Sequence, residues 1–419
     1  MTTMNLIINA KQLLDELQTL ATFSSEPAPV VTRIVFSEAD RAAREYVKGL
    51  AADAGLRTRE DAVGNTFFRW AGTDDSLPAV GTGSHIDAIP NAGMYDGTVG
   101  VLGGLEAIRA LQRSGFRPTR SIELLLFTSE EPTRFGIGCL GSRLLSGTLT
   151  ADAARKLKDS EEKGLEEVCR KAGFTGELET VMLPPGDYAH FVELHIEQGP
   201  LLEREELSIG VVTNIAAPAS LRIVIEGEGG HAGALLMPQR RDALAAAAEV
   251  ILAVETAARA TGIMDTVATV GICDVFPGAV NSVPSRACLS LDVRDTDEAR
   301  RDGVLERIAR VCSEITVRRG VTITSEMLNA DAPAVSSAKI IAAIESACAT
   351  QGITSKRMVS RAYHDSLFMA RITPMAMIFI PCRSGVSHRP DEYAKPEDIA
   401  RGVLVLAQTL AQLSSTQAG

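Results

Sequence analysis

The stretch SIELLLFTSEEP, residues 121–132, indicates the fold class of this 419-residue chain. Its apolar run has the length of a buried strand, and two adjacent carboxylates follow where the run stops. Similar short runs occur at 79–82 and 191–194, and residues 99–113 between them show the apolar spacing of an amphipathic helix. Strands that alternate with helices predict an α/β domain whose mostly parallel sheet is covered by helices.

A different pattern begins near Val212 and ends near Asp331. Its order of strand, helix, two strands and helix resembles an inserted α+β unit of the βαββαβ type. We expect the inserted domain at 213–331 and the first domain at 1–212 and 332–419. The elements predicted in these parts are helices at 6–22, 37–54, 239–259, 297–315, 337–350 and 396–413, and strands at 221–226, 267–273, 286–294 and 375–380.

Composition narrows the class of protein. With 45% hydrophobic and 23% charged residues the chain is typical of a folded globular protein. A net charge of -11 argues against a nucleic-acid surface and favours a small-molecule substrate. No apolar stretch approaches the ~18 residues of a membrane span, and the N-terminal residues lack a targeting pattern, so we expect a cytoplasmic protein. The seven cysteines form no CxxC pair, which predicts reduced thiols that hold no metal.

Four of the six histidines stand in polar contexts at predicted strand ends: His85, His195, His231 and His388. In GSHID, residues 83–87, a strand period of two places His85 and Asp87 on one face. The Asp87 carboxylate could then accept the second imidazole N–H and fix the tautomer of a metal ligand. A hydrogen-bonded surface histidine is the alternative, and the motif alone favours it.

Asp96 lies eleven residues after His85, just ahead of the predicted helix 99–113. An aspartate at a helix start is commonly an N-cap. Its two oxygens diverge, however, so a carboxylate can also bridge two cations. The bridging interpretation requires that other ligands converge on Asp96.

Further candidate ligands follow other strands. Glu130 and Glu131 end the strand quoted above, and neighbours in extended chain point opposite ways, so one can coordinate a metal while the other holds the attacking water. A solvated acidic loop is the alternative. The full candidate set is His85, Asp96, Glu131, His195 and His388. Imidazole and carboxylate ligands without a thiolate suit Zn²⁺ or Mn²⁺.

One motif points to a different function. GEGGHA, residues 227–232, matches the G-x-G-x-x-A turn of dinucleotide-binding proteins, and Glu249 lies at the right distance for a ribose contact. This would make the protein an NAD-dependent oxidoreductase. The next helix is expected only near Pro238, whereas a phosphate-binding turn must open directly into a helix. The motif is therefore weak evidence.

Taken together, the motifs resemble the amidase/hydantoinase/carbamoylase branch of the dimetal M20 peptidase family over essentially the full length. The resemblance is carried by HID, EE, HIEQGP, GGHAG and SHRP, at residues 85–87, 130–131, 195–200, 229–233 and 387–390. It implies an aminopeptidase/phosphorylase-like catalytic domain with an inserted ferredoxin-like lid and dimerisation domain. Residues 130–143, 215–220 and 360–371 favour members that act on ureidoglycolate over those that act on allantoate or N-carbamoyl-L-amino acids.

The resemblance also implies site residues and partners. One metal ion would be held by His85, Asp96 and His195, and another by Asp96, Glu131 and His388. The implied metal is Mn²⁺, with Zn²⁺ or Co²⁺ as alternatives, and Glu130 is the implied general base. The implied substrate contacts are Gln198, His231, Asn281, Arg294 and His364. A homodimer through the inserted domain is expected.

These residues suit hydrolysis of a small ureido acid with release of ammonia. Glu130 would take a proton from the attacking water and return it to the departing nitrogen. His231 would donate to the oxygen on which charge develops. The planar fork of Arg294 would hold the carboxylate of the substrate, with help from Asn281.

Some of these residues also have purely structural interpretations. Without the resemblance, Arg294 is better explained by an ion pair with Asp292 or Asp295. For His364 a packed, hydrogen-bonded histidine is as good an interpretation as a substrate contact. His190 is expected to be structural.

Overall fold

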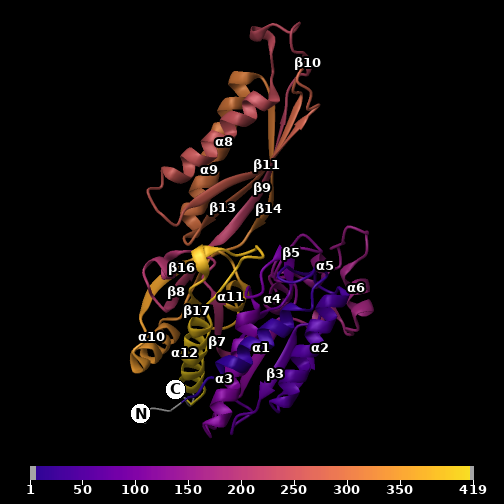
Figure 1. Cartoon of the computed structure of the whole chain (residues 1–419). Coiled ribbons are helices and arrows are strands. Elements are labelled where there is room, and N and C mark those ends of the chain that lie inside the picture. Colours follow the sequence, from indigo (N-terminus) through magenta and orange to yellow (C-terminus); the bar gives the residue numbers. More distant parts are fainter. Residues whose placement is uncertain (1–5, 416–419) are drawn as a thin grey trace. The chain divides into compact units, whose positions relative to one another are not determined.

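The computed structural model of the chain describes residues 6–415 (Figure 1). Residues 1–5, which belong to the stretch considered for a targeting segment, lie outside them. The α-helices are α1 Ala10–Ala21, α2 Glu38–Asp53, α3 Thr98–Arg113, α4 Leu140–Leu145, α5 Ala151–Ala154, α6 Leu165–Ala172, α7 Leu201–Arg204, α8 Ala243–Arg259, α9 Glu298–Arg319, α10 Ala338–Gln351, α11 Asp365–Met369 and α12 Pro396–Ser415. The strands are β1 Val31–Arg33, β2 Arg57–Glu60, β3 Thr66–Trp70, β4 Ala79–His85, β5 Ala88–Ala92, β6 Ile122–Phe127, β7 Tyr188–Ile196, β8 Ile209–Ile215, β9 Ala217–Glu226, β10 Gly230–His231, β11 Val267–Phe276, β12 Ser282–Val283, β13 Arg286–Asp295, β14 Thr322–Ala330, β15 Ala334–Val335, β16 Ser355–Ser360 and β17 Met375–Ile380.

The chain divides into two compact units. Unit 2 comprises Asn214–Ala334 and Val359–Tyr363, and unit 1 comprises the rest. The expected boundaries placed residues 359–363 in the first domain. Two contacts explain why they belong to unit 2: the Ala216 N–H donates to the Ser360 carbonyl at 2.8 Å, and Arg361 Nη2 lies 2.5 Å from Asp265 Oδ1.

The large sheet of unit 1 has the strand order β15-β8-β17-β7-β4-β6-β3-β2, with β16 also paired to β8. Strands β17, β7, β4 and β6 run parallel, whereas β8 pairs with β17, β3 with β6 and β2 with β3 in antiparallel fashion. The prediction of a mostly parallel sheet was therefore wrong in extent, because the sheet is mixed. The edge strand Arg57–Glu60 is polar and exposed, so no apolar run marks it in the sequence.

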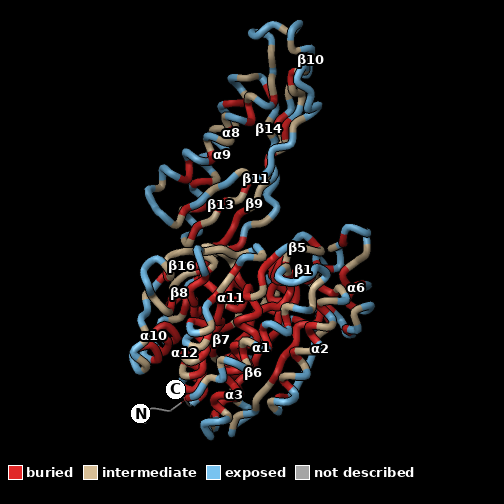
Figure 2. Tube along the Cα trace, viewed as in Figure 1, coloured by how far each residue is buried: buried red, intermediate tan, exposed pale blue. Residues whose placement is uncertain are grey.

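The two faces of β7 separate the core from the polar side of unit 1. Val192 and Leu194 belong to the main apolar core, into which α3 and α12 also pack. Figure 2 shows that much of the chain around β7 and α3 is buried. Glu193 and His195 point the other way, because side chains alternate along a strand. On that side Glu193 Oε2 accepts hydrogen bonds from the backbone N–H and hydroxyl of Ser366, at the start of α11. The α11 side of β7 thus carries polar groups inside the protein.

Unit 2 is built on an antiparallel sheet with the strand order β11-β13-β9-β14. Helices α8 and α9 pack on each other and on this sheet, and their apolar residues form its core with Ile223, Leu289 and Val293. Strand β11 is an edge of the sheet and exposes Ile272 and Phe276. The short strands β10 and β12 form a separate antiparallel ribbon.

The dinucleotide-binding motif does not have the structure that its chemistry needs. Residues Gly230–His231 form a short strand, and the next α-helix begins only at Ala243. No helix N-terminus therefore follows the glycines directly, as phosphate binding would require. Glu249 forms ion pairs with Arg318 and Arg319 instead.

Two expectations from composition concern the whole fold. Among residues 6–415, no helix is both long and apolar enough to cross a membrane. All seven cysteines are free thiols. In the described chain, none of them belongs to a group of side chains with the spacing of metal ligands.

Candidate metal centre

Three neighbouring strands of unit 1 end at the same edge of the sheet. Strand β4 ends at His85 and pairs in parallel with β6 and β7. Glu130 and Glu131 follow the end of β6, and His195 is the penultimate residue of β7. In open α/β sheets the carboxyl ends of such strands are where ligands bind. The structure thus brings these predicted side chains together.

Asp96 lies at the centre of this group, and its two oxygens face different histidines. Oδ1 is 3.7 Å from His85 Nε2 and 3.2 Å from His195 Nε2. Oδ2 is 3.2 Å from His388 Nε2, whose other neighbour is Glu131 Oε1 at 3.2 Å. These residues form two sets of candidate ligands: His85, Asp96 and His195, and Asp96, Glu131 and His388. Within each set the ligand atoms lie within 4.8 Å of one another, and the two sets share Asp96. This is the arrangement that a bridging carboxylate requires.

The side chain of Asp96 is not engaged in helix capping. The N-cap of α3 is Gly97, at φ 65°, and no side chain caps the helix. A Cβ at position 97 would lie 2.5 Å from the His85 ring, so only glycine allows this close approach. The N-cap interpretation of Asp96 is therefore wrong, and both of its oxygens face the group of candidate ligands.

Backbone carbonyls orient two of the imidazoles. His85 Nδ1 lies 3.0 Å from the carbonyl oxygen of Asp87, and His195 Nδ1 lies 3.0 Å from that of Ile196. A carbonyl can only accept, so each Nδ1 carries the proton and donates it. In the neutral rings the lone pair is then on Nε2, the atom that lies beside Asp96 in both residues, which is how metal-binding histidines are commonly held.

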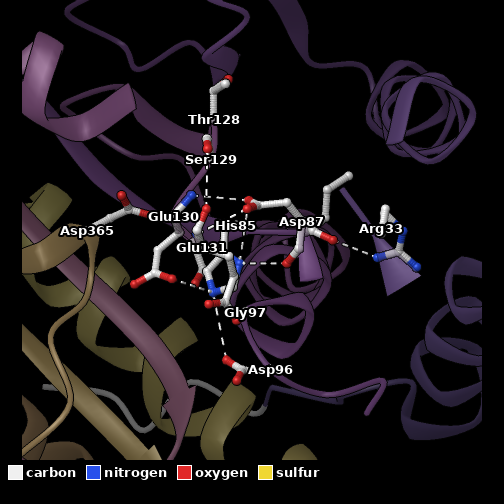
Figure 3. A network of polar contacts seen from close by, with 12 residues as sticks. Arg33, His85, Asp87, Asp96, Gly97, Thr128, Ser129, Glu130, Glu131 and Asp365 are labelled. Atoms are coloured by element: carbon white, nitrogen blue, oxygen red, sulfur yellow. Dashed lines mark hydrogen bonds and ion pairs between the residues drawn. The ribbon is translucent and has the colours of Figure 1, made fainter. Parts of the chain in front are cut away.

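Asp87 supports the site in a way that differs from the prediction. Its carboxylate is 3.7 Å from His85 Nδ1, too far for a hydrogen bond, and it accepts instead from the backbone N–H groups of Glu130 at 3.2 Å and Glu131 at 3.1 Å (Figure 3). The chain turns after β4, so the main-chain carbonyl of Asp87 reaches the imidazole first. Burial, and then the nearby Asp40, raise the pKa of Asp87 to about 7. Asp87 thereby links the ends of β4 and β6.

Glu130 is buried, and its carboxylate points toward the site. Oε2 is 3.8 Å from His85 Nε2, and the Cys139 thiol lies 3.4 Å from Oε1. The preceding Ser129 has φ 56°, a left-handed conformation that is costly without glycine and often found at functional sites. Burial, followed by the charges of Glu131 and Asp365, raises the pKa of Glu130 well above its usual range. The carboxylate therefore has a high affinity for a proton.

The donor set fits divalent cations in both chemistry and charge. Seven carboxylates are buried in and around the two sets: Asp87, Asp96, Glu130, Glu131, Glu193, Asp365 and Glu392. Ionised carboxylates are very costly to bury unless they are paired or coordinate metal. The imidazoles supply lone pairs but little positive charge when they act as ligands. Two divalent ions would offset the excess negative charge.

Gln198 contacts Asp96 directly, although the resemblance implies a role in substrate binding. Its amide nitrogen donates to Asp96 Oδ2 at 2.8 Å, and its backbone is left-handed at φ 54°. Its Oε1 is buried and has no hydrogen-bond partner among residues 6–415. This acceptor is available to a ligand in the site.

His364 and His190 are both buried. The ring of His364 packs against His195, with 4.5 Å between ring centroids, and against Phe379. Burial, and then the charge of His195, keep its pKa well below the usual value, so His364 is neutral. This matches the packed interpretation, and a substrate contact stays a prediction. Burial lowers the pKa of His190 to about 4, as expected of a structural histidine.

Three predicted substrate contacts belong to unit 2. His231 and Asn281 are neighbours on the β10–β12 ribbon, where the Ala232 N–H donates to the Asn281 carbonyl at 2.8 Å and His231 is exposed. Arg294 is not on this ribbon but on β13, where its Nε lies 2.7 Å from Asp292 Oδ1. The ion pair with Asp292 is the structural interpretation of Arg294.

Sequence analysis missed several residues that the structure places beside the candidate ligands. They are Ser387, Glu392, Glu193 and Asp365. Glu193 forms a third candidate ligand group with His195 and His364, on the α11 side of β7. The position of Glu193 inside the apolar run 191–194 is the signal that the sequence offers, because a carboxylate buried in a strand needs partners.

The chain is similar to known proteins in sequence. The model of peptidase family M20/M25/M40 matches residues 81–412. Ureidoglycolate hydrolase of Oryza sativa subsp. japonica is 54% identical over 414 residues, which covers 97% of this chain and 85% of that protein. N-carbamoyl-L-amino acid amidohydrolase of Geobacillus stearothermophilus is 39% identical over 409 residues, with 97% and 99% covered.

The fold is also similar to that of a solved structure. The crystal structure of AtUAH in complex with glyoxylate superposes with a TM-score of 0.87 at 53% identity, covering 98% of each chain. The family match extends from β4, which carries His85, to α12, so it includes every candidate ligand of the two sets. The chain therefore belongs to peptidase family M20/M25/M40.

Proposed function

We propose that this protein is a metal-dependent amidohydrolase that cleaves a C–N bond of ureidoglycolate and releases ammonia. The observation that carries the proposal is the sharing of Asp96 between two sets of ligands. Two further facts support ureidoglycolate as the substrate. The sequence is 54% identical to that of a ureidoglycolate hydrolase, and the fold is shared with a structure that holds glyoxylate. Hydrolysis of an N-carbamoyl-L-amino acid is the second candidate, supported by the relative at 39% identity.

The proposed metal centre holds two divalent ions. His85, Asp96 and His195 would hold one, and Asp96, Glu131 and His388 the other. Bound there, the ions would supply positive charge that polarises the scissile carbonyl and eases the loss of a proton from water. Mn²⁺ is the ion favoured by the resemblance, and Zn²⁺ and Co²⁺ accept the same ligands.

The residues of the chain would divide the remaining work. Glu130 takes the proton of the attacking water and later passes it to the departing nitrogen. Asp87 keeps the Glu130–Glu131 turn in place through its two backbone hydrogen bonds. The free Oε1 of Gln198 could accept an N–H of the substrate.

Unit 2 is proposed to act as a lid and dimerisation domain. The roles of His231, Asn281 and Arg294 in binding the substrate stay predictions. The free edge of β11 and the exposed Ile272 and Phe276 on it support a homodimer, because a second sheet could continue the strand order there. A location in the cytoplasm also stays a prediction.

The substrate can be identified by its product. We expect ammonia to be released from ureidoglycolate with a kcat/KM at least about tenfold above that for allantoate or for several N-carbamoyl-L-amino acids, since pocket differences of a few groups are worth ~1–3 kcal/mol. A coupled ammonia assay with the protein loaded with Mn²⁺ measures this. A higher value for an N-carbamoyl-L-amino acid would favour the second candidate function instead.

Removal of metal should abolish activity reversibly. Chelation followed by dialysis is expected to leave a folded protein without turnover, because the site loses the positive charge that polarises the carbonyl and eases the loss of a proton from water. Addition of Mn²⁺ should restore ammonia release at about two ions per chain. Circular dichroism before and after chelation separates loss of metal from loss of fold. Full activity in the chelated protein would contradict a metal-dependent mechanism.

A further inference from the structure

We infer that Glu392 is a positioning residue that holds the loops of Asp96 and His388 together for metal binding. The inference rests on the proposed metal centre, and it assigns a role to a residue that no motif indicated. Glu392 is separated from Asp96 by 296 residues, yet its carboxylate accepts hydrogen bonds from the backbone N–H of that aspartate and of the residue before it. It belongs to the segment that follows His388.

One carboxylate oxygen of Glu392 holds the Asp96 loop. Oε1 accepts the backbone N–H of Tyr95 at 2.8 Å and that of Asp96 at 3.1 Å. Both bonds are buried, and a buried N–H left without an acceptor is costly. The main chain at Asp96 is thus fixed by a side chain from a distant part of the sequence.

The other oxygen of Glu392 acts through Ser387. Oε2 lies 2.9 Å from Ser387 Oγ, and the same hydroxyl lies 2.8 Å from Asp96 Oδ2. Ser387 immediately precedes His388, whose Nε2 faces the same Asp96 oxygen. His388 itself has φ 59°, a left-handed backbone that its surroundings must stabilise. Glu392 therefore connects the candidate bridging ligand to the segment that carries a ligand of the second ion.

The approach of Glu392 also needs a glycine opposite it. A Cβ at Gly93 would lie 2.4 Å from Glu392 Cβ and 2.6 Å from Oε1, so a side chain at position 93 would displace the carboxylate. Gly93 has no left-handed φ, so it is the close contact rather than backbone freedom that favours glycine here. The contact between the two loops therefore depends on the small size of residue 93.

Two substitutions of Glu392 distinguish hydrogen bonding from charge. Glu392→Ala removes the acceptor of both N–H groups and the partner of Ser387. Glu392→Gln keeps an acceptor for the N–H groups, and its amide N–H can donate to Ser387 Oγ, which leaves the serine proton for Asp96. We therefore expect the alanine variant to bind Mn²⁺ about 10–100-fold more weakly, a typical loss for a group that orients metal ligands, and the glutamine variant to stay within about threefold of the wild type.

The experiment is calorimetric titration of the metal-free, full-length protein with Mn²⁺ alone, alongside the thermal midpoint of each variant. The matched control is Glu123→Gln, a buried glutamate at the start of β6 that accepts from Tyr188, which should keep wild-type affinity for Mn²⁺. If Glu392→Ala is folded and binds Mn²⁺ as tightly as the wild type while Asp96→Ala does not, the inference is wrong and the metal centre stands. If Asp96→Ala also binds two ions with wild-type affinity, the proposed metal centre fails, and with it the role of Glu392.

If Glu392→Ala does not fold, the glutamine variant decides: a large loss of affinity there contradicts a role through hydrogen bonds.

Discussion

The Glu130→Gln variant is expected to bind metal like the wild type and to lose about 10²–10⁴-fold in kcat, the usual contribution of a positioned general base. The amide has the size of the carboxylate but no affinity for the proton of the attacking water. Glu130 belongs to neither set of candidate ligands, so its loss should leave Mn²⁺ binding unchanged. The rate of ammonia release at saturating substrate tests the loss in kcat. Calorimetric titration with Mn²⁺ tests whether metal binding is unchanged.

Glu123→Gln is the matched control for that variant. Glu123 is buried at the start of strand β6, whereas Glu130 is buried just after the end of the same strand, so each change replaces one buried carboxyl group by an amide of the same size. The control should keep full turnover. Wild-type activity in Glu130→Gln would show that another group accepts the proton. A loss of metal in that variant would instead mean that Glu130 is itself a ligand.

The candidate ligands could be predicted from the sequence because each lies close to or after the end of a strand. His85 and the Glu130–Glu131 pair follow short apolar runs, and parallel strands bring such ends to one edge. That the central strands run parallel followed from the helices between them. The pattern of apolar and polar residues along each strand was thus enough to predict that the candidate ligands lie at one edge of the sheet.

The supporting groups could not be predicted in the same way, because their partners are far away in the sequence. Glu392 and Asp96 are 296 residues apart, and Glu193 and Ser366 are 173 residues apart. A carboxylate in a polar loop has many possible partners, and only the packing of the loops selects one. Asp87 shows the limit at short range: the strand period placed it correctly beside His85, but the turn after β4 presents its carbonyl rather than its carboxylate.

The same reasoning explains the parts of the fold that were missed. The edge strand β2 has four exposed polar residues, so hydrophobic periodicity carries no signal there. It is held in the sheet by backbone pairing with β3, an interaction that does not depend on side-chain type. Residues 359–363 were assigned to the first domain because they lie within its sequence range, whereas the Arg361–Asp265 pair ties them to unit 2.

Substitution of Asp96 should have the widest effect on the metal centre, because it is the one residue common to both ligand sets. We expect Asp96→Ala to lose both ions and measurable turnover, a larger effect than the roughly 10–100-fold loss that follows removal of an orienting group. His388→Ala removes a ligand from the second set alone, so it should retain one tightly bound Mn²⁺ held by His85, Asp96 and His195. Metal analysis after gel filtration, with the thermal midpoint as a check on folding, separates the two patterns. If Asp96→Ala keeps one ion and His388→Ala loses both, Asp96 is not the bridge and the two sites depend on His388 instead.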